Sequence, residues 1–362
     1  MANGHPGAAM PRLPALYARA VWQAVPQSRQ RSLTPLQPSS TGPTGVRASG
    51  PVHIEAGHLA RYRRVCGFAA DGPVPATYPQ VLAFPLLLDL MTSEDFPFPA
   101  VGAVHVSNCI TQDRVLGESE SLGLSVSVTH VIPHRRGMQA TVVTEAHVDA
   151  EPVWRATSTY LGSRRSAPAG TTTEPDSAEP VDVQPVTVGP LGEDVYQRLP
   201  TPLVHEPWQV PADLGRRYAV ASGDCNPIHL SAITARPFGF RAPIAHGMWT
   251  VARVLSQLED LLIHPPGRLR CDVAFKRPLP LPSTVVMSAY VAEEDPPPDG
   301  NPEVGTSQDP PAPTLRPIAF RVEASTPAVG PGARGHGGGV DEGAFTAEPP
   351  TDLHLVGKLA IG

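Results

Sequence analysis

The sequence is poor in cysteine and has no paired cysteine motif. Its 362 residues contain 4 cysteines, and no two of them form a Cys-x-x-Cys pair. They stand far apart, at Cys66, Cys109, Cys225 and Cys271. Neither a zinc ribbon nor a disulfide framework is indicated, so reduced thiols in a cytoplasmic protein are expected.

The chain also lacks a basic field and a long apolar run. The net charge is −6, and no basic stripe interleaved with aromatic residues occurs, so nucleic-acid binding is not expected. The longest apolar run, Val81 to Leu90, is about half as long as a membrane span and contains Pro85 and Asp89. It is predicted to be a core helix, and no membrane partner is expected.

Lysine is almost absent, whereas arginine is abundant. The first fifty residues contain five arginines and no acidic residue, a pattern that formally resembles a transit peptide. The arginine bias fits a GC-rich coding sequence better, so a cytoplasmic location is preferred. Residues 1–50 are rich in Pro, Ser and Gly and are expected to be mostly disordered, with the apolar piece Leu13 to Val25 as a candidate edge element.

From 51 to 164 the sequence predicts a folded unit. The stretch from Tyr78 to Met91 is predicted to be a buried helix, opened by Pro79 in its first turn and disturbed at Pro85. Alternating apolar positions after this helix predict sheet strands at 104–110, 122–128, 140–148 and 153–161.

A second unit, 196–362, repeats this order after a linker. Residues 165–195 are rich in Pro, Ser, Thr and acidic residues and have little to bury, which is typical of a linker. An amphipathic helix is predicted from Gly247 to Ile263, and alternating strands follow it. Two insertions rich in Pro, Gly and acidic residues are expected to be mobile surface loops, at about 292–314 and 326–350.

The two units also match in sequence at one point. At a constant offset of 156, Tyr62 corresponds to Tyr218 and Gly67 to Gly223. The chain is therefore interpreted as a duplicated unit. Where the second copy has Asp224, the first has Phe68, and the first copy is expected to lack an acid–base pair.

The segment that follows Gly223 carries the chemistry. Asp224 and His229 stand five residues apart, and Pro227 biases Asn226 toward an extended conformation, so a shaped turn is predicted. Such a turn can aim a carboxylate and an imidazole at one small volume, as proton transfer to and from a substrate and water requires. Further along, Gly247 stands at a predicted helix start, where its N–H could stabilise an oxyanion.

These residues resemble the MaoC-like, (R)-specific enoyl-CoA hydratase (hydratase 2) family. The motif Tyr-x-x-x-Ser-Gly-Asp-x-Asn-Pro-Ile-His-x5-Ala runs from Tyr218 to Ala235, and Gly239-Phe240 and the segment Ile244 to Met248 also fit. The resemblance implies an α+β double hotdog of the actinobacterial type, in which each unit wraps an antiparallel sheet around a long central helix. The first unit matches only loosely and is expected to be a degenerate copy.

The resemblance implies reversible hydration of trans-2-enoyl thioesters to (3R)-3-hydroxyacyl thioesters in fatty-acid or polyketide metabolism. The substrate would be carried by coenzyme A or by an acyl carrier protein, with no cofactor and no metal ion, and the protein would be a monomeric pseudo-dimer or a homodimer. Asp224 is expected to be the base, His229 the acid or the residue that orients water, and Gly247 N–H the oxyanion donor. Residues expected to bind the substrate are Ser222, Asn226, His246, Met248, Arg241 and Lys276, and Arg236, Arg268 and Arg277 are further candidates for contacts with phosphate.

Other interpretations remain open. A hotdog thioesterase would use an acidic residue to activate water at the carbonyl, and a non-catalytic acyl-binding subunit would need no acid–base pair. Asp224 could form only an Asx-turn, and His246 could pack or cap rather than contact substrate. Cys225 is better explained as a small packed thiol than as a nucleophile, and a metal site made of the same turn is disfavoured.

Loss of the acid in the first unit has a possible use. In double-hotdog relatives, loss of the second site leaves room for a long acyl chain between the units. Phe68 and the apolar helix Val81 to Leu90 are the predicted lining of such a channel.

Overall fold

The protein was analysed as a computed structural model, which describes residues 9–24, 44–94, 96–163, 202–262, 268–291, 318–325 and 353–361. The predicted linker (165–195) and the two predicted insertions (292–314 and 326–350) lie outside the described residues.

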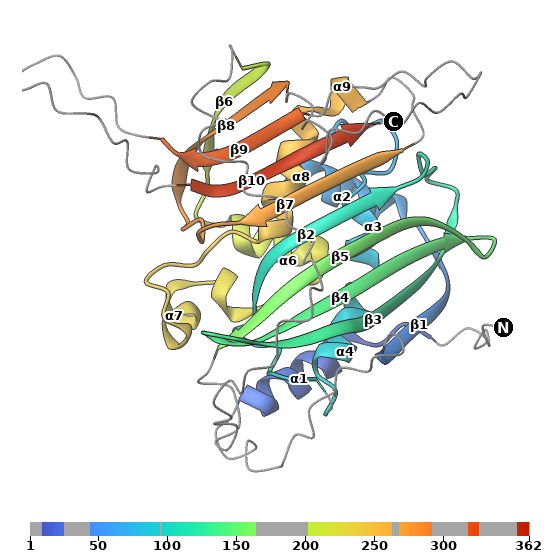
Figure 1. Ribbon diagram of the computed structural model, residues 1–362, viewed down its shortest axis with the longest axis vertical. Helices are drawn as coiled ribbons and strands as arrows, with labels where there is room; N and C mark the ends of the chain where they lie inside the picture. The colour runs from blue at the N-terminus through green and yellow to red at the C-terminus, as the bar shows by residue number, and fades with distance from the viewer. Residues whose placement is uncertain are drawn as a thin grey trace, which may run out of the picture.

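One ten-stranded sheet runs through both units, with the strand order β1-β3-β4-β5-β2-β7-β10-β9-β8-β6 (Figure 1). The strands of the first unit are β1 Thr44–His53, β2 Val104–Gln112, β3 Ser121–His134, β4 Gly137–Val148 and β5 Glu151–Ser163. Those of the second are β6 Val204–Val210, β7 Leu269–Phe275, β8 Ser283–Val291, β9 Ile318–Ala324 and β10 Leu353–Ile361. Each neighbouring pair is antiparallel.

The strand order confirms the duplication. From its outer edge inward, the first unit has the strand order β1-β3-β4-β5-β2. From the opposite outer edge inward, the second unit has the order β6-β8-β9-β10-β7, which is the same order when β6 to β10 are matched with β1 to β5. The two copies meet where β2 pairs with β7, with Asn108 opposite Val273. The chain therefore contains the two sheets of a hotdog pair, joined edge to edge as a double hotdog.

The period-2 pattern predicted the strands correctly because one face of the sheet is buried. In β3 the side chains of Leu122, Leu124, Val126 and Val128 are buried, while the Gly and Ser residues between them are only partly buried. Successive side chains of a strand point to opposite faces, so this alternation places the apolar side chains against the helices.

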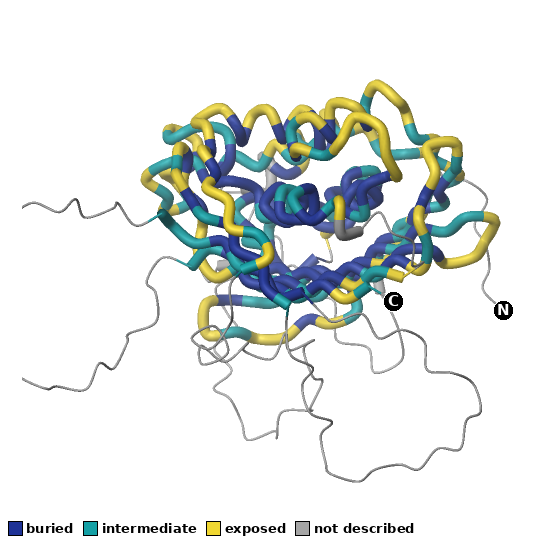
Figure 2. The backbone as a smooth tube through the Cα atoms, turned by 90° about the horizontal axis from the view of Figure 1, so that it is seen from above, coloured by how far each residue is buried: buried dark blue, intermediate teal, exposed yellow. Residues whose placement is uncertain are grey.

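The predicted helix from Tyr78 to Met91 is present as two pieces, α3 (Tyr78–Leu82) and α4 (Phe84–Met91). Pro85 lies in the first turn of α4 and has no N–H to continue the hydrogen bonds of α3, which explains the break. The second predicted helix is likewise divided, into α8 (Gly247–Gln257) and α9 (Glu259–Leu262). Buried helices occupy the centre of the molecule in Figure 2, between the sheet and an exposed outer layer.

Two shorter helices were not predicted, α2 (Ala56–Cys66) and α6 (Leu214–Ser222). Each ends at a glycine in the left-handed region, Gly67 (φ 86°) and Gly223 (φ 77°), a conformation that side chains disfavour. The helices pack together, and the ring centroids of Tyr62 and Tyr218 lie 6.2 Å apart. The residues that revealed the repeat are thus the contact residues and caps of one equivalent helix pair.

The N-terminal segment is more ordered than expected in its described parts. The apolar piece forms a helix, α1 (Leu13–Ala24), and the edge strand is β1, which pairs with β3 and begins the first unit at Thr44 instead of 51. Arg19 and Arg47 both bind Asp89 of α4, at 2.6 Å each. These ion pairs and the buried side chains of α1 supply the contacts that composition could not reveal. No helix in the described ranges is long and apolar enough to cross a membrane.

Candidate active site

The turn after α6 is set by close backbone packing. A Cβ atom on Gly215 of α6 would lie 1.8 Å from the His229 carbonyl oxygen, so only glycine lets this helix approach the turn. Asn226 then caps a short 3-10 helix, η3 (Pro227–His229), by accepting a hydrogen bond from Ile228 N. Asn226 has φ −55° and ψ 127°, so it is extended, as predicted from the proline that follows it.

Asp224 uses one carboxylate oxygen to brace this turn. Its Oδ1 accepts a hydrogen bond from Asn226 N at 3.0 Å, which is the Asx-turn. Its Oδ2 lies 3.9 Å from His246 Nε2, and the side chain is 29% exposed and lines a cavity. The structural role of Asp224 thus leaves one oxygen facing the cavity.

His229 is buried and held in one tautomer. Its Nδ1–H donates to the Ile244 carbonyl oxygen at 2.8 Å, so in the neutral ring Nε2 carries the lone pair. Helix α7 (Ala232–Ala235) follows this turn, and Ser231 is its N-cap residue. His229 therefore offers Nε2 for proton transfer.

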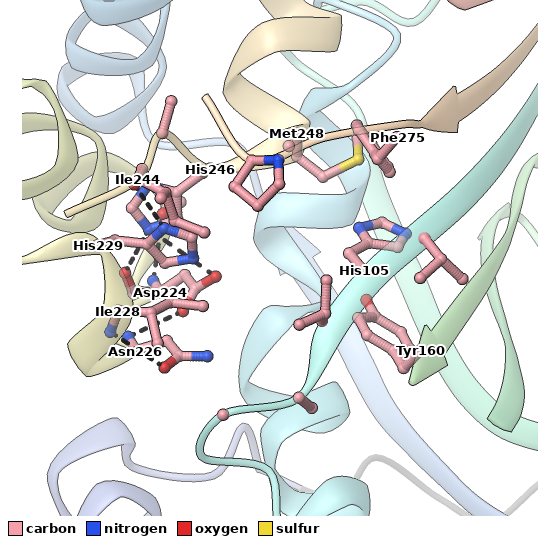
Figure 3. A pocket seen from close by; sticks show the side chains of 18 of the residues that line it. His105, Tyr160, Asp224, Asn226, Ile228, His229, Ile244, His246, Met248 and Phe275 are labelled. Carbon is pink, nitrogen blue, oxygen red and sulfur yellow. Dashed lines mark hydrogen bonds and ion pairs between the residues drawn. The ribbon is translucent and has the colours of Figure 1, made fainter. Parts of the chain in front are cut away.

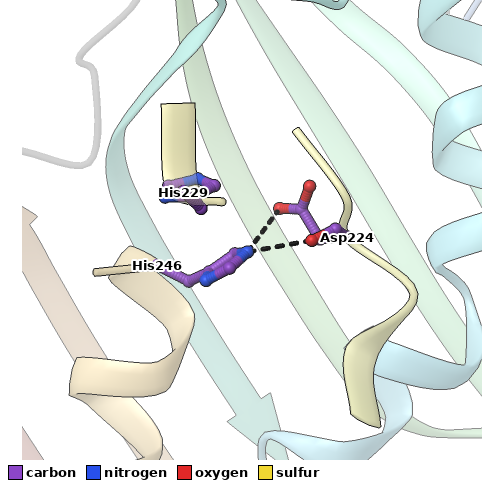
Figure 4. A group of neighbouring side chains, drawn as sticks. All are labelled: Asp224, His229 and His246. Carbon is purple, nitrogen blue, oxygen red and sulfur yellow. Dashed lines mark hydrogen bonds and ion pairs between the residues drawn. The ribbon is translucent and has the colours of Figure 1, made fainter. Parts of the chain in front are cut away.

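His246 joins the two residues (Figure 4). Its Nε2–H donates to the backbone oxygen of Asp224 at 2.9 Å. Its ring stacks on that of His229, with centroids 3.7 Å apart and an interplanar angle of 25°. His246 is also the N-cap residue of α8, so one side chain ties the Asp224 turn to the start of this helix.

Burial controls the electrostatics of the cluster. Desolvation raises the pKa of Asp224, although the nearby His229 and the N–H of Asn226 oppose it. Desolvation lowers the pKa of His229, opposed by Asp224, and lowers that of His246 further, with His229 adding to the effect. The charge of each of Asp224 and His229 shifts the pKa of the other, so they titrate as a coupled pair.

The donor atoms of this cluster are close enough to hold a metal ion, because one from each of Asp224, His229 and His246 lies within 4.8 Å of the others. The two imidazoles stack face to face, and each already uses one nitrogen to hold a backbone carbonyl oxygen. This arrangement fits a hydrogen-bonded pair that handles protons better than a set of converging ligands. Cys225, once a possible fourth ligand or nucleophile, is exposed and is not among the cavity residues.

The cavity has a volume of about 480 Å³ and is lined by both units. Figure 3 shows Asp224, His229 and His246 on one side of it and His105 and Tyr160, from β2 and β5, on the other. Apolar residues of α3 and α4 in the first unit also line it, namely Val81, Phe84, Leu87, Leu88 and Met91. A volume in this range suits a small-molecule ligand with a substantial apolar part.

Gly247 stands at the first position of α8, where a backbone N–H has no intrahelical partner. A Cβ atom at this position would meet the ring of Phe275 at 2.8 Å. Gly247 and Met248 both line the cavity. Glycine thus lets β7 pack against the helix start and leaves the N–H beside the cavity.

Most of the predicted site residues come together, and three of the predicted arginines do not. The cavity is lined by Ser222, Asp224, Asn226, His229, His246, Gly247, Met248, Lys276 and Arg277. Ser222 lies there as a brace, since its hydroxyl donates to Tyr218 O and accepts from Asp224 N. Arg241 was predicted to bind substrate, but it is exposed and outside the lining, as are Arg236 and Arg268.

Several lining residues were missed in the sequence. Tyr17, His105, Arg136 and Tyr160 come from the N-terminal helix and the first unit, and no local motif marks them. Phe68, which was predicted to line a channel, instead stacks on Tyr62 with ring centroids 6.3 Å apart and is not among the lining residues. The first copy therefore contributes its helix and sheet face, rather than its turn, to the cavity.

Comparison with known proteins agrees with this geometry. The family described as MaoC like domain matches residues 186–299. The chain is 36% identical to 3-hydroxyacyl-thioester dehydratase X of Mycobacterium tuberculosis over 242 residues, which cover 67% of this chain and 78% of that protein. The chain belongs to the MaoC-like family of double-hotdog proteins.

Two solved structures extend the comparison to the whole fold. The crystal structure of HtdX from Mycobacterium tuberculosis matches with a TM-score of 0.59 and 26% identity, covering 88% of this chain and 100% of that one. A MaoC-like dehydratase from Phytophthora capsici matches with a TM-score of 0.53 and 13% identity, covering 89% and 96% of the two chains. The second similarity is one of fold alone.

Proposed function

We propose that the protein is a hydro-lyase that hydrates trans-2-enoyl thioesters to (3R)-3-hydroxyacyl thioesters and catalyses the reverse dehydration. The observation that carries the proposal is the meeting of Asp224 Oδ2, His229 and the N–H of Gly247 at one apolar cavity. The similarity to a 3-hydroxyacyl-thioester dehydratase supports the same reaction.

The Asp224–His229 pair can carry out the proton transfers when it holds one proton. In the starting state Asp224 is ionised and His229 is protonated on Nε2. A water molecule bound to Asp224 gives this carboxylate a proton as the water oxygen attacks C3, and His229 donates its Nε2 proton to C2. The carbonyl oxygen gains negative charge, which the N–H of Gly247 and the N-terminal end of α8 stabilise. Return of the proton from Asp224 to His229 completes the cycle, and the reverse sequence dehydrates the hydroxyacyl group.

The apolar wall supplied by α3 and α4 provides the acyl site. Leu87, Leu88 and Met91 face the cavity beyond the catalytic residues, so a chain longer than that of crotonyl can extend between the units. A series of enoyl-CoA substrates tests this: activity is expected to persist above four carbons, and a steady fall from four carbons upward would contradict it.

The anionic end of the substrate is proposed to meet Arg136, Lys276 and Arg277, which are exposed and line the cavity. Guanidinium and ammonium groups suit the phosphates of coenzyme A or of a carrier-protein arm. A charge-reversing Lys276→Glu variant is expected to raise KM for enoyl-CoA more than it lowers kcat. An unchanged KM would exclude Lys276 from this role.

The proposal is tested by mixing the protein with crotonyl-CoA and a long-chain enoyl-CoA and following loss of the conjugated-enoyl absorbance. Asp224→Asn and His229→Gln are each expected to lower kcat by roughly 10²- to 10⁴-fold. Undiminished turnover in both variants would refute the assignment. Release of free thiol would favour a thioesterase, and binding without turnover an acyl-binding subunit.

Thermal unfolding provides the control for Asp224→Asn. The raised pKa of Asp224 means that its ionised form is less favourable in the folded protein than in the unfolded chain. The neutral amide removes this cost, so the variant is expected to unfold at the same temperature as the wild type or higher. A loss of activity in Asp224→Asn could then not be attributed to unfolding of the variant.

The same proposal includes a cytoplasmic location and a chain that acts as its own pseudo-dimer. Two hotdog units pair through β2 and β7 within one chain, and the four cysteines are free. Free thiols fit a reducing compartment. A monomeric mass in solution would support the pseudo-dimer, whereas a stable dimer would support the homodimer.

A further inference from the structure

The N-terminal helix α1 reaches the catalytic turn through one side chain, Tyr17. The Tyr17 hydroxyl donates a hydrogen bond to the carbonyl oxygen of Gly223 at 2.7 Å and accepts one from the backbone N–H of Cys225. These two groups flank Asp224 on either side. They are 206 and 208 residues away from Tyr17 in the chain.

Among the described residues, the backbone oxygen of Gly223 and the N–H of Cys225 have no other hydrogen-bond partner. Tyr17 is therefore the side chain that holds both backbone groups, although Cys225 itself is exposed. With His246 on the oxygen of Asp224, side chains hold three backbone groups in succession. The position of the Asp224 carboxylate is therefore set from outside its own helix.

Helix α1 is fixed firmly enough to serve as this support. Leu16 and Ala20 are buried against the core. Arg19 binds the carboxylate of Asp89 at 2.6 Å and the hydroxyl of Thr92 at 2.8 Å, both on or just after α4. Leu13 fills the space beside Gly223, where an added Cβ atom would lie 2.8 Å from its Cδ1 atom.

Tyr17 also belongs to the cavity. Tyr17 and Ala20 line it from α1, on the side of the Asp224 turn. Burial, and next the charge of Asp224, raise the pKa of the Tyr17 phenol, so the hydroxyl keeps the proton that it donates to Gly223.

We propose that Tyr17 is a positioning residue for Asp224, and that α1 is a part of the active site contributed from outside both hotdog units. This inference rests on the proposed function, in which Asp224 exchanges protons with the substrate. Tyr17 acts through the turn and does not itself exchange a proton with the substrate.

The test compares Tyr17→Phe with the wild type. The phenyl ring still lines the cavity, so KM for crotonyl-CoA should change by less than about twofold, whereas kcat should fall roughly tenfold to a hundredfold, as expected for the loss of the two hydrogen bonds that hold the turn. Freeing the turn hydrates Asp224 and lowers its raised pKa. The acidic limb of the pH profile of kcat/KM should therefore move to lower pH.

Tyr78→Phe is the matched control. The Tyr78 hydroxyl lies 2.6 Å from His58 Nδ1, and the residue is buried but does not line the cavity. This variant also loses a tyrosine hydroxyl that is hydrogen-bonded, here to a histidine side chain, so its stability should fall while its kcat and pH profile stay as in the wild type. A kcat loss in Tyr17→Phe no larger than in Tyr78→Phe, or an unmoved acidic limb, would overturn the proposal.

Amide hydrogen exchange separates this inference from the proposed function. The Cys225 amide should exchange faster in Tyr17→Phe and at the wild-type rate in Tyr78→Phe. Unchanged exchange in Tyr17→Phe would overturn the positioning role even if kcat falls. If the wild type does not hydrate enoyl-CoA, the proposed function fails, and exchange at Cys225 still decides whether Tyr17 holds the turn.

Discussion

At the scale of single residues, the site is a set of side chains with two tasks each. Asp224 braces its turn through Oδ1 and presents Oδ2 to the cavity. His229 anchors Nδ1 on Ile244 and keeps Nε2 for chemistry. One atom of each side chain is fixed so that the other has a defined position, which is the preorganisation that proton transfer requires.

His246 provides a prediction at this scale. His246→Phe keeps an aromatic ring stacked on His229 but loses the hydrogen bond to the oxygen of Asp224. Because one buried hydrogen bond is lost, kcat is expected to fall about tenfold, with KM changed much less. Steady-state kinetics with crotonyl-CoA measure both, and a rise in KM without a fall in kcat would mean that His246 binds substrate instead.

The motif predicted that Asp224, His229 and Gly247 come together, because their spacing reflects a local turn and a local helix start, and all three line the cavity. It failed for Arg241, which lies only a few residues from the cavity in sequence but points to solvent. A residue outside the turn has no local geometry that fixes the direction of its side chain. Tyr17 and Arg136 were missed because they are far from the motif in sequence and reach the cavity only through tertiary packing.

At the scale of elements, the cavity is built by pairing the Asp224–His229 turn of one unit with helices of the other. Helices α3 and α4 of the first unit carry no acid–base pair, yet six of their residues line the cavity, Gln80, Val81, Phe84, Leu87, Leu88 and Met91. The first unit therefore helps to shape the cavity, although it carries no acid–base pair.

Enlarging a side chain of α4 is predicted to shorten the acyl chain that fits. Leu88→Phe adds volume in the cavity wall and should lower kcat/KM for a long-chain enoyl-CoA at least tenfold, while crotonyl-CoA is affected much less. Leu82→Phe is the matched control, because Leu82 is partly buried but does not line the cavity. Equal losses for short and long substrates in Leu88→Phe would indicate general overpacking.

At the scale of the whole molecule, two hotdog units share one sheet and one cavity. Their junction places β2 beside β7, and His105 of β2 packs against Tyr160 and Phe275, with ring centroids 4.6 and 5.0 Å apart. Burial lowers the pKa of His105 to about 4. The interface between the units therefore contains a histidine that remains neutral over most of the physiological range.

Stability is predicted to fall as the pH drops below about 6.5, the ordinary pKa of histidine. His105, His229 and His246 all have lowered pKa values in the folded protein. The unfolded chain then binds more protons between pH 6.5 and the lower folded values, so protonation favours unfolding. The raised pKa of Asp224 has the opposite effect on the free energy of unfolding, but it is one group against three histidines.

Urea unfolding at pH 7.5 and 5 measures this effect. The free energy of unfolding should be lower at pH 5, and His105→Phe, which keeps the aromatic packing but cannot titrate, should reduce the difference. An equal pH dependence in the variant would show that His105 does not contribute.

The sequence by itself determined the local features of this protein. Period-2 alternation determined the strands, Pro85 and Gly247 determined helix boundaries, and the turn from Gly223 to His229 determined that Asp224 and His229 lie close together, because each depends on neighbours a few residues away. Only the tertiary structure decided how the copies share one cavity and that α1 supports Asp224. Those contacts join residues more than two hundred positions apart, and they exist only because the burial of apolar surface brings α1, α4 and the catalytic turn together.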